Sequence, residues 1–283
     1  MIRYVIFSIS IIVFFCLSSC NSRQSEEKKA ENRLLKIEQL VSENAYCAAK
    51  LEIDSIHALY PRLVDKRREA QAFMDTIVRR ESARTIIYSD SVLSQKRKEI
   101  AAIQHNFRFE KDEKYQETGN FVHQMLRTEA NTGRNYLKVY VDERADFYLI
   151  SSYCGSKIGH THIYASCDSF FAETSVVDLS NPSNYSFTND GQRWEMVTFE
   201  QEDAAKIVEF ITHYADKRIK ITLKGEKPYV YYLSEQDKKA IIESYDFWIV
   251  KKEVVQLERE IKQATAKIEH IKQRYNKENT SND

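Results

Sequence analysis

Four side chains in the middle of the chain have the chemistry to bind a metal ion. Cys154, His160, His162 and Cys167 follow the spacing C-x5-H-x-H-x4-C. Thiolate sulfur and imidazole nitrogen are ligands for zinc and copper, and residues two apart on a strand share one face. The spacing is not that of a standard finger, and a turn at residues 155–159 would leave Cys167 a strand length from Cys154. This geometry disfavours both a four-ligand site and a disulfide, and favours strand histidines with small buried cysteines.

Aromatic side chains in the second half of the chain offer a different kind of site. Trp194, Tyr229 and Tyr231 are the residues that we would expect to contact a ligand. Aromatic residues are also ordinary strand residues, and a place in the core is the simpler explanation for Trp194. The full set that could form a platform for a sugar or a peptide is Tyr185, Phe187, Trp194, Tyr229, Tyr231 and Tyr232.

Signatures of known enzymes are missing from the sequence. It contains no G-x-S-x-G elbow, no P-loop, no H-E-x-x-H and no glycine-rich dinucleotide fingerprint. Asp142, Glu143, Asp146 and Asp168 could supply paired carboxylates, but such residues between strands are usually turn formers. We therefore predict no catalytic residue and no cofactor, and expect a protein that is not an enzyme.

The N-terminal residues indicate export. Residues 1–19 carry one charge, Arg3, and an apolar run of about 14 residues extends from Tyr4 to Leu17. A basic start, a short apolar centre and a small-residue exit are typical of a secretory signal peptide. The run is too short to span a bilayer as a helix, which takes roughly 20 residues.

The end of this run, Leu17-Ser18-Ser19-Cys20, resembles a bacterial lipobox, the site recognised by the lipoprotein signal peptidase. The resemblance implies cleavage before Cys20, a diacylglyceryl thioether on its sulfur and acylation of the new amino group by a fatty acid such as palmitate. Two or three acyl chains anchor a protein stably to a bilayer, whereas one does not. By resemblance to enteric lipoproteins, Asn21 in place of Asp favours the outer membrane, on its periplasmic or its external face. The alternative is an ordinary signal peptide with an incidental cysteine.

Charge and cysteine content limit the partners. The chain has 42 basic and 42 acidic residues, and removal of Arg3 with the signal peptide leaves 41 minus 42, a net charge of −1. Without a basic excess to neutralise phosphates, nucleic acid is not expected as a partner. Besides the lipidated cysteine, Cys47, Cys154 and Cys167 remain, an odd number that does not indicate a disulfide framework.

Residues 30–104 are predicted to form a helical arm. Pro61 removes a helical hydrogen bond and disfavours helix at Tyr60, so the helix should bend or end there. If the chain reverses at Pro61, residues 30–60 add a third helix to a bundle; if Pro61 only kinks the helix, these residues extend toward the membrane and are free to pair with another copy. Both alternatives stay open. A coiled-coil seam with spacings of three and four consists of Leu34, Ile37, Val41, Asn44, Ala48 and Leu51.

Residues 234–276 are predicted to form a coiled-coil helix. Ser234 followed by Asp237 has the spacing of a capping box. One such helix cannot bury its apolar stripe alone, so the two arms are expected to pair antiparallel beside the central domain. Through the coiled coil, we expect a protein partner or self-association. The seam residues are Phe247, Val250, Val254, Leu257, Ile261, Ala264, Ile268, Ile271 and Tyr275.

Residues 105–233 are predicted to form a β-rich α+β domain with one amphipathic helix over 204–215 and Gly225 at a hairpin turn. Tyr148 to Tyr153, a glycine turn and His160-Thr161-His162 resemble β-rich domains of uncharacterised bacterial proteins that carry coiled-coil tails. The resemblance implies a fold and no activity. Strands are expected over 136–141, 147–153, 160–166, 170–177, 193–199, 218–223 and 229–233.

The sequence thus predicts an α+β fold in which long antiparallel coiled-coil helices flank a mixed β-rich domain with one or two short helices. Its leading functional hypothesis is a non-catalytic envelope lipoprotein whose helical stalk presents a protein-interaction module. The alternative is a lipoprotein that binds glycan or peptide through an aromatic face. The predicted segments are a signal peptide (1–19), a tether (20–29), the N-terminal helical arm (30–104), the β-rich domain (105–233), the C-terminal helix (234–276) and a disordered tail (277–283).

Overall fold

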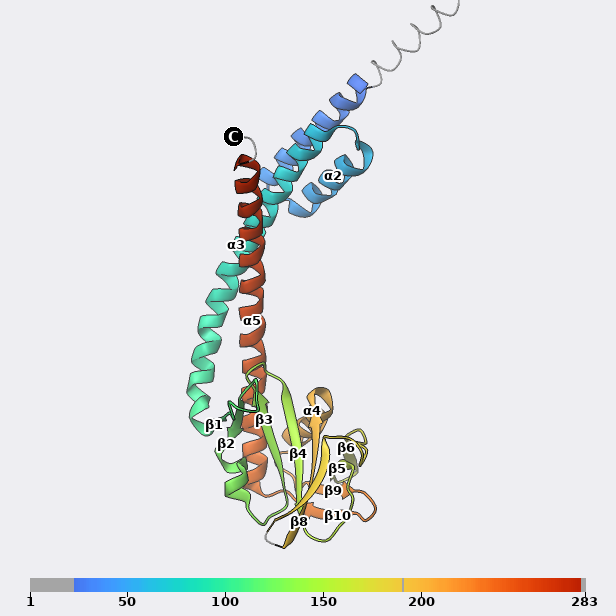
Figure 1. Ribbon diagram of the computed structural model, residues 1–283, viewed down its shortest axis with the longest axis vertical. Coiled ribbons are helices and arrows are strands. Elements are labelled where there is room, and N and C mark those ends of the chain that lie inside the picture. The colour runs from blue at the N-terminus through green and yellow to red at the C-terminus, as the bar shows by residue number, and fades with distance from the viewer. Residues whose placement is uncertain (1–22, 190, 281–283) are drawn as a thin grey trace, which may run out of the picture. The chain divides into compact units, whose positions relative to one another are not determined.

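The computed structural model describes residues 23–189 and 191–280 (Figure 1). The α+β class and the β-rich central domain are confirmed, and the domain contains two antiparallel sheets. The chain divides into a helical unit, made of residues 23–88 and 260–280, and a central unit, made of residues 89–259. The predicted signal peptide over 1–19 and the lipidation site Cys20 lie outside the described residues.

The helical unit begins with a helix over residues 23–42, which includes most of the segment predicted as a tether. The chain then turns at Asn44, whose φ of 60° lies in the left-handed region that asparagine tolerates. The Asn44 side-chain oxygen accepts a hydrogen bond from the Tyr46 hydroxyl at 2.8 Å. The predicted coiled-coil seam through Asn44 is therefore wrong. Helix α2 (Tyr46–Leu59) begins after the turn and buries a different set of positions, so that Leu51, a predicted seam residue, is 69% exposed.

A second reversal follows at residues 60–63, around Pro61, before helix α3 (Val64–Ile103). Residues 30–60 therefore pack back on the start of α3 and complete a three-helix arrangement. Arg33 of the first helix pairs with Glu52 of α2, and Lys50 of α2 pairs with Glu81 of α3. The shared core consists of Ala30, Leu34, Ile37, Val41, Tyr46, Ala49, Ile53, Ile56, Tyr60, Leu63, Ala70 and Ile77.

Helix α5 (Glu235–Thr280) and α3 are long, at 46 and 40 residues. Residues 277–280, predicted to belong to a disordered tail, are the end of α5. None of the described helices is both long enough and apolar enough to span a membrane. The described residues do not show a continuous coiled-coil arrangement: the seam positions of α5 alternate between buried (Phe247, Val254, Ala264, Ile271), half-buried (Val250, Leu257, Ile261, Ile268) and exposed (Tyr275).

The central unit contains a six-stranded sheet, here named the large sheet, and a four-stranded small sheet (Figure 1). All neighbouring strands are antiparallel. In spatial order, the large sheet consists of β1 (Phe107–Glu110), β2 (Asn120–His123), β3 (Tyr136–Asp142), β4 (Phe147–Cys154), β8 (Gln192–Glu200) and β7 (Asn184–Asn189). The small sheet consists of β10 (Tyr229–Tyr232), β9 (Lys220–Lys224), β5 (His162–Cys167) and β6 (Phe170–Glu173).

The core of the central unit lies between the inner faces of the two sheets, helix α4 (Gln201–His213) and the first part of α5. Trp248 of α5 stacks on Phe147 of β4 at 4.7 Å, and its indole N–H donates to the carbonyl of Ala145 at 3.0 Å. The N-terminus of α5 is capped as predicted, because the Asp237 N–H donates to the Ser234 hydroxyl at 3.1 Å. The Asp237 carboxylate does not complete a capping box; it pairs with Arg134.

Candidate binding surface and a buried polar network

One side of the large sheet carries the core, and the other carries a row of aromatic side chains. Cross-strand partners share a face, so the pairs Phe187–Trp194 and Tyr185–Met196 lie on the same side of the sheet as the pair Tyr140–Tyr148 of β3 and β4. None of these residues belongs to the hydrophobic core. We name this set the aromatic face: Tyr140, Tyr148, Tyr185, Phe187, Trp194 and Met196.

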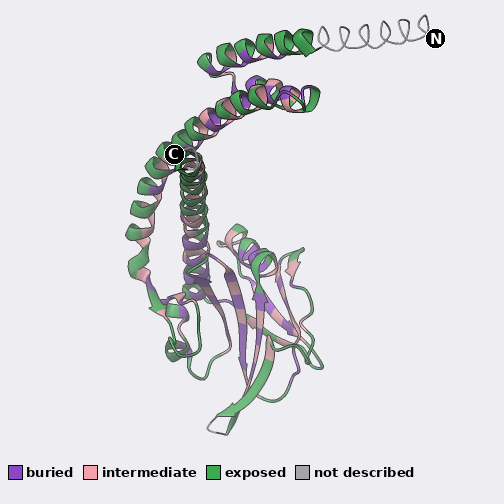
Figure 2. Ribbon diagram, turned by 45° about the horizontal axis from the view of Figure 1, so that its top comes forward, coloured by how far each residue is buried: buried purple, intermediate pink, exposed green. Residues whose placement is uncertain are grey.

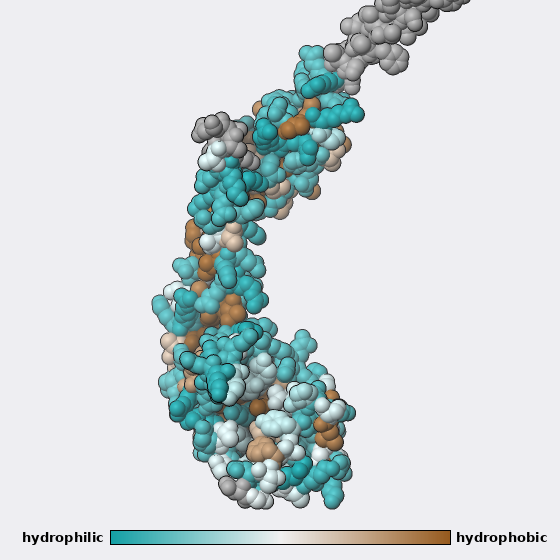
Figure 3. All heavy atoms as spheres, in the orientation of Figure 1, coloured by the Kyte–Doolittle hydropathy of each residue, from teal (hydrophilic) through white to brown (hydrophobic). Residues whose placement is uncertain are grey.

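The aromatic face is open to solvent at the β7 end. Tyr185 and Phe187 are 47% and 42% exposed, and Figure 2 shows β7 as exposed along nearly its whole length. Over β3, β4 and β8 the surface in Figure 3 is pale to brown, less hydrophilic than the teal surface around it. Exposed aromatic side chains gathered on one side of a sheet make this face a candidate interaction surface.

The rings of the aromatic face are ordered against one another. Phe187 lies nearly parallel to Trp194, with an interplanar angle of 8° and ring centroids 6.3 Å apart, and Tyr185 lies 6.3 Å from Phe187. Tyr140 and Tyr148 stack more closely, at 4.6 Å. Burial raises the pKa of the hydroxyls of Tyr140, Tyr148 and Tyr185. These hydroxyls are therefore uncharged hydrogen-bonding groups at neutral pH.

The six aromatic residues singled out from the sequence do not form one platform. Tyr185, Phe187 and Trp194 come together, with Trp194 half-buried on the outer face rather than in the core. Tyr229 and Tyr231 instead face inward from the small sheet, where Tyr229 packs on Tyr153 of β4 at 4.8 Å. Tyr232 lies on the outer face of the small sheet, under the guanidinium of Arg218 at 3.8 Å. Of the three proposed ligand contacts, only Trp194 is on the aromatic face.

The predicted metal ligands are likewise separated. Cys154 is on the outer side of β4, beside Gln192 at 3.2 Å, whereas His160 packs on the inner side of the same strand. His162 pairs with Glu173 at 2.9 Å on the outer face of the small sheet, and Cys167 is buried in the core. Among the described residues, no three histidine, cysteine, aspartate or glutamate side chains are placed to hold a metal ion. The four-ligand arrangement is therefore wrong, because residues 160 and 161 precede β5 and the alternation of a strand does not apply to them.

His160 belongs instead to a buried hydrogen-bonded row. Its Nε2 lies 2.7 Å from the Ser151 hydroxyl and its Nδ1 lies 3.2 Å from Glu195 Oε2. Glu195 also accepts the backbone N–H groups of Ile158 at 3.0 Å and of His160 at 3.3 Å. Arg193 Nε lies 3.3 Å from Glu195 Oε1. We name Ser151, His160 and Glu195 the buried network.

The protonation of the buried network follows from its surroundings. Burial lowers the pKa of His160 and outweighs the opposing effect of Glu195. Burial alone would raise the pKa of Glu195, but the hydrogen bonds from the backbone of residues 158–160 and from the His160 ring lower it. A neutral His160 therefore donates from Nδ1 to an ionised Glu195, and its Nε2 accepts from the Ser151 hydroxyl. The contact is a charge-assisted hydrogen bond rather than a pair of opposite charges.

A hydroxyl, an imidazole and a carboxylate in this order are also the parts of an activated nucleophile. Here Ser151 and His160 have no exposed surface and Glu195 is only 3% exposed, so a substrate cannot reach the hydroxyl. The network instead fixes residues 155–161, where Gly159 has a φ of 58°. The fit is tight, since a Cβ on Gly225 would lie 2.2 Å from the Gly159 carbonyl oxygen. We assign the buried network a structural role.

Ser151 and Glu195 were not singled out from the sequence. A signal for Glu195 exists, because it occupies the same alternate positions of its strand as Val197 and Phe199, which face the core. The four carboxylates considered for catalysis are separately engaged: those of Glu143, Asp146 and Asp168 contact Gly119, Gln201 and Lys217, and only that of Asp142 holds a local turn. Asp142 accepts the backbone N–H groups of Arg144 at 2.9 Å and Asp146 at 2.7 Å in the β3–β4 turn.

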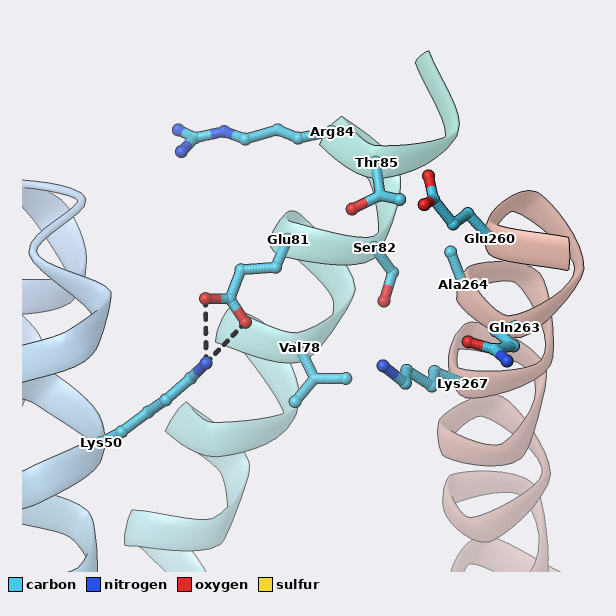
Figure 4. A pocket seen from close by; sticks show the side chains of 10 residues that line it. All are labelled: Lys50, Val78, Glu81, Ser82, Arg84, Thr85, Glu260, Gln263, Ala264 and Lys267. Carbon is cyan, nitrogen blue, oxygen red and sulfur yellow. Dashed lines mark hydrogen bonds and ion pairs between the residues drawn. The ribbon is translucent and has the colours of Figure 1, made fainter. Parts of the chain in front are cut away.

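The helical unit contains an open groove of about 800 Å³ between α2, α3 and α5 (Figure 4). Both carboxylate oxygens of Glu81 accept hydrogen bonds from Lys50, at 2.9 and 2.7 Å, on one side of the groove. Lys267 extends from α5 on the other side. The lining carries both signs of charge and does not converge on one ligand type; it consists of Lys50, Val78, Glu81, Ser82, Arg84, Thr85, Glu260, Gln263, Ala264 and Lys267.

Comparison of the chain with protein-family models, with curated proteins and with solved structures finds no match.

Proposed function

We propose that this protein is a non-catalytic, lipid-anchored protein of the cell envelope whose β-rich central domain binds a protein partner. Three observations support the proposal: the lipobox-like Leu17-Ser18-Ser19-Cys20, the two long helices α3 and α5, and the aromatic face. The aromatic face is the observation that carries the binding role.

The composition and geometry of the aromatic face favour a protein as the ligand. Tyrosine, tryptophan and methionine are enriched where proteins contact one another, and the face carries all three. A sugar stacks on an open ring face, whereas Tyr140 and Tyr148 cover one another, and Phe187 lies between Tyr185 and Trp194. All three ring pairs lie within the about 4.5–7 Å typical of aromatic pairs that pack on each other. Rings that pack on each other in this way, with the uncharged hydroxyls of Tyr140 and Tyr148 beside them, suit a protein surface better than a glycan.

We further propose that α3 and α5 act as the stalk, paired as antiparallel coiled-coil arms. Within the central unit, Lys96 and Arg97 of α3 pair with Glu253 and Glu258 of α5 at 2.7 and 2.9 Å. In an antiparallel pair the residue number of the partner on α5 should fall as the residue number on α3 rises. From Lys96 to Arg97 the partner instead changes from Glu253 to Glu258, so the pairing of the two helices needs a direct test. Cysteine crosslinking between successive seam positions of the two helices tests the pairing; crosslinks confined to residues 93–103 and 243–258 would contradict it.

Lipid attachment has its own test. Mass spectrometry of the mature protein should find diacylglycerol and an acyl chain on an N-terminal Cys20, and globomycin should block maturation. An unmodified Cys20 thiol, or maturation that is unaffected by globomycin, would overturn the anchoring proposal and leave the binding role of the central domain to be judged separately.

Partner binding is tested by crosslinking in intact cells at native expression. Phe187→Ser should abolish the crosslinked species, since it removes the middle ring of the exposed row. The matched control is Phe171→Ser, because Phe171 is also an exposed strand residue, at 61%, but lies on the small sheet. The absence of any crosslinked protein, or equal loss in both variants, would contradict the proposed role. Saturable quenching of tryptophan fluorescence by an oligosaccharide, lost in Phe187→Ser, would favour the glycan-binding alternative.

A further inference from the structure

We infer that the free edge of β7 is a self-association site, at which β7 of a second copy pairs antiparallel about a two-fold axis through Ser186. The inference starts from the position of β7, which is the last strand of the large sheet. An unpaired edge strand is a template for another strand, and proteins normally protect it with charge, proline or shortness. β7 has six residues, Asn184-Tyr185-Ser186-Phe187-Thr188-Asn189, with no charge and no proline.

The backbone groups that face outward follow from the pairing with β8. The Thr198 N–H donates to the Ser183 carbonyl at 2.8 Å, and residues 183 and 198 are in register with the β7–β8 pairs. Hydrogen-bonded pairs alternate along an antiparallel ladder, so residues 185 and 187 bond toward β8. The N–H and C=O groups of Ser186 and Thr188 and the C=O group of Asn184 therefore point away from the sheet, where a further strand would bind, whereas the Asn184 N–H donates to the Asn181 carbonyl at 2.9 Å.

The side chains then select the register. In an antiparallel pair the residues directly opposite each other share a face of the sheet. A two-fold axis must therefore pass midway between two copies of the same residue. An axis placed between neighbouring residues would set an inner side chain opposite an outer one. An axis through Ser186 pairs the two Ser186 residues, sets Tyr185 opposite Phe187 of the second copy, and sets Asn184 opposite Thr188 of the second copy. The Ser186 pair then contributes two backbone hydrogen bonds, and each of the two Asn184–Thr188 pairs contributes one, from the Thr188 N–H to the Asn184 carbonyl, which gives about four. Two cross-strand aromatic pairs form on the outer side.

A second copy is the occupant that the strand itself favours. Because β7 is uncharged, a copy of it brings no like charges into opposition, which would destabilise the pair. The other edges are less suited to self-pairing: β1 carries Arg108 and Glu110, β6 carries Glu173, and the four-residue β10 ends at Tyr232 under Arg218. The two-fold axis is perpendicular to the sheet, so both aromatic faces would lie on the same side and form one surface.

The contact is small. Pairing of two six-residue strands buries less than the roughly 1,200 Å² of a stable complex, so the association is expected to be weak in dilute solution. Attachment to a common membrane, which rests on the proposed function, would raise the effective concentration and strengthen it.

The test is a disulfide trap in purified full-length protein in detergent solution at high concentration, which does not depend on lipidation or on a partner. In a Cys47→Ser background, Ser186→Cys places two cysteines in directly opposite positions, about 5.5 Å apart between Cα atoms. The matched control is Thr188→Cys on the same strand and face, whose two copies would lie about 14 Å apart, from four residues along the strand and the separation between strands. Ser186→Cys should form at least about ten-fold more interchain disulfide, since only that spacing suits a disulfide.

A second pair of variants tests the backbone contact. Ser186→Pro removes an N–H that points away from β8, and should abolish the concentration-dependent dimer in sedimentation experiments, whereas Ser186→Ala should retain it. Circular dichroism of both variants checks that the domain is folded. Equal disulfide yields from Ser186→Cys and Thr188→Cys would overturn the inference, and so would a dimer that persists in a folded Ser186→Pro variant.

Discussion

Replacement of Glu195 by alanine should be among the most destabilising single substitutions in the central unit. The change removes the acceptor of the Ile158 and His160 backbone N–H groups and of the His160 ring, at 3.0, 3.3 and 3.2 Å. Three buried donors then lose their partner, and each unsatisfied donor costs about 1–3 kcal/mol. Relaxation and entry of water recover part of this sum, so we expect a loss of about 4 kcal/mol, within the range for breaking a buried charged contact.

The measurement is urea-induced unfolding followed by tryptophan fluorescence, since Trp194 is on β8 beside the substitution and Trp248 is in the core. For a unit of this size, 4 kcal/mol corresponds to a fall in Tm of about 8–16 °C. Ser151→Ala provides a graded comparison, because it removes one hydroxyl donor to His160 Nε2 and should cost only about 1 kcal/mol. A Glu195→Ala protein within about 1 kcal/mol of the unsubstituted protein would refute the structural role of the buried network.

Three further predictions concern buried polar groups. Because burial lowers the pKa of His160 in the fold, the unfolded chain binds a proton below about pH 6.5 that the folded chain does not. The free energy of unfolding should therefore fall as the pH drops from 7.5 to 5.5. His160→Gln should reduce the slope of this fall by at most about 1.4 kcal/mol per pH unit. The lowered pKa of Glu195 acts in the same direction, since its contribution is present above about pH 4.5 and is lost as pH falls through the folded value. Tyr231→Phe should raise the free energy of unfolding by about 1 kcal/mol in urea titrations, because the Tyr231 hydroxyl is buried without a hydrogen-bond partner among the described residues, whereas Tyr229→Phe should be neutral. Lys238→Met should cost about 2–3 kcal/mol in the same assay, because the Lys238 ammonium donates to the carbonyls of Ala215 and Lys217 at 2.7 and 2.9 Å; Lys239→Met, at an exposed position, should change little.

The strands that the sequence predicted are those with one face in the core. β3, β4 and β8 alternate apolar and polar or aromatic residues, which is the signature of a half-buried strand. The strands that were missed are β1, β2 and β7. β7 is exposed on both sides, so it is held by backbone pairing with β8 and shows no alternation of apolar and polar residues. β1 and β2 have only four residues each, too few for such an alternation to be recognised.

The helical arm shows how a regular spacing can mislead. The intervals from Leu34 to Leu51 continue through Asn44 as if one helix were present, yet the chain turns there with a φ of 60°. Asparagine adopts the left-handed conformation more readily than most residues, and this local preference together with burial of Tyr46 and Ile53 in a new phase decides the outcome. The same kind of local exception, Gly159 with a φ of 58° ahead of β5, removed His160 from the face that it was predicted to share with His162.

The buried network and the exposed edge of the large sheet are physically connected through one side chain. Arg193 reaches Glu195 through Nε at 3.3 Å and the Ser186 hydroxyl of β7 through Nη2 at 2.8 Å. Since side chains alternate along β8, Glu195 points into the core while Trp194 and Met196, its neighbours, point to the aromatic face. The ionised carboxylate that holds residues 155–161 from within thus also accepts from the Arg193 guanidinium, which adds one side-chain contact to the backbone pairing between β7 and β8. Arg193 and Glu195 are the two charged residues on the side of β8 that also carries Val197 and Phe199, so we expect loss of the Glu195 carboxylate to weaken the contact between Arg193 and Ser186 as well as the packing of residues 155–161.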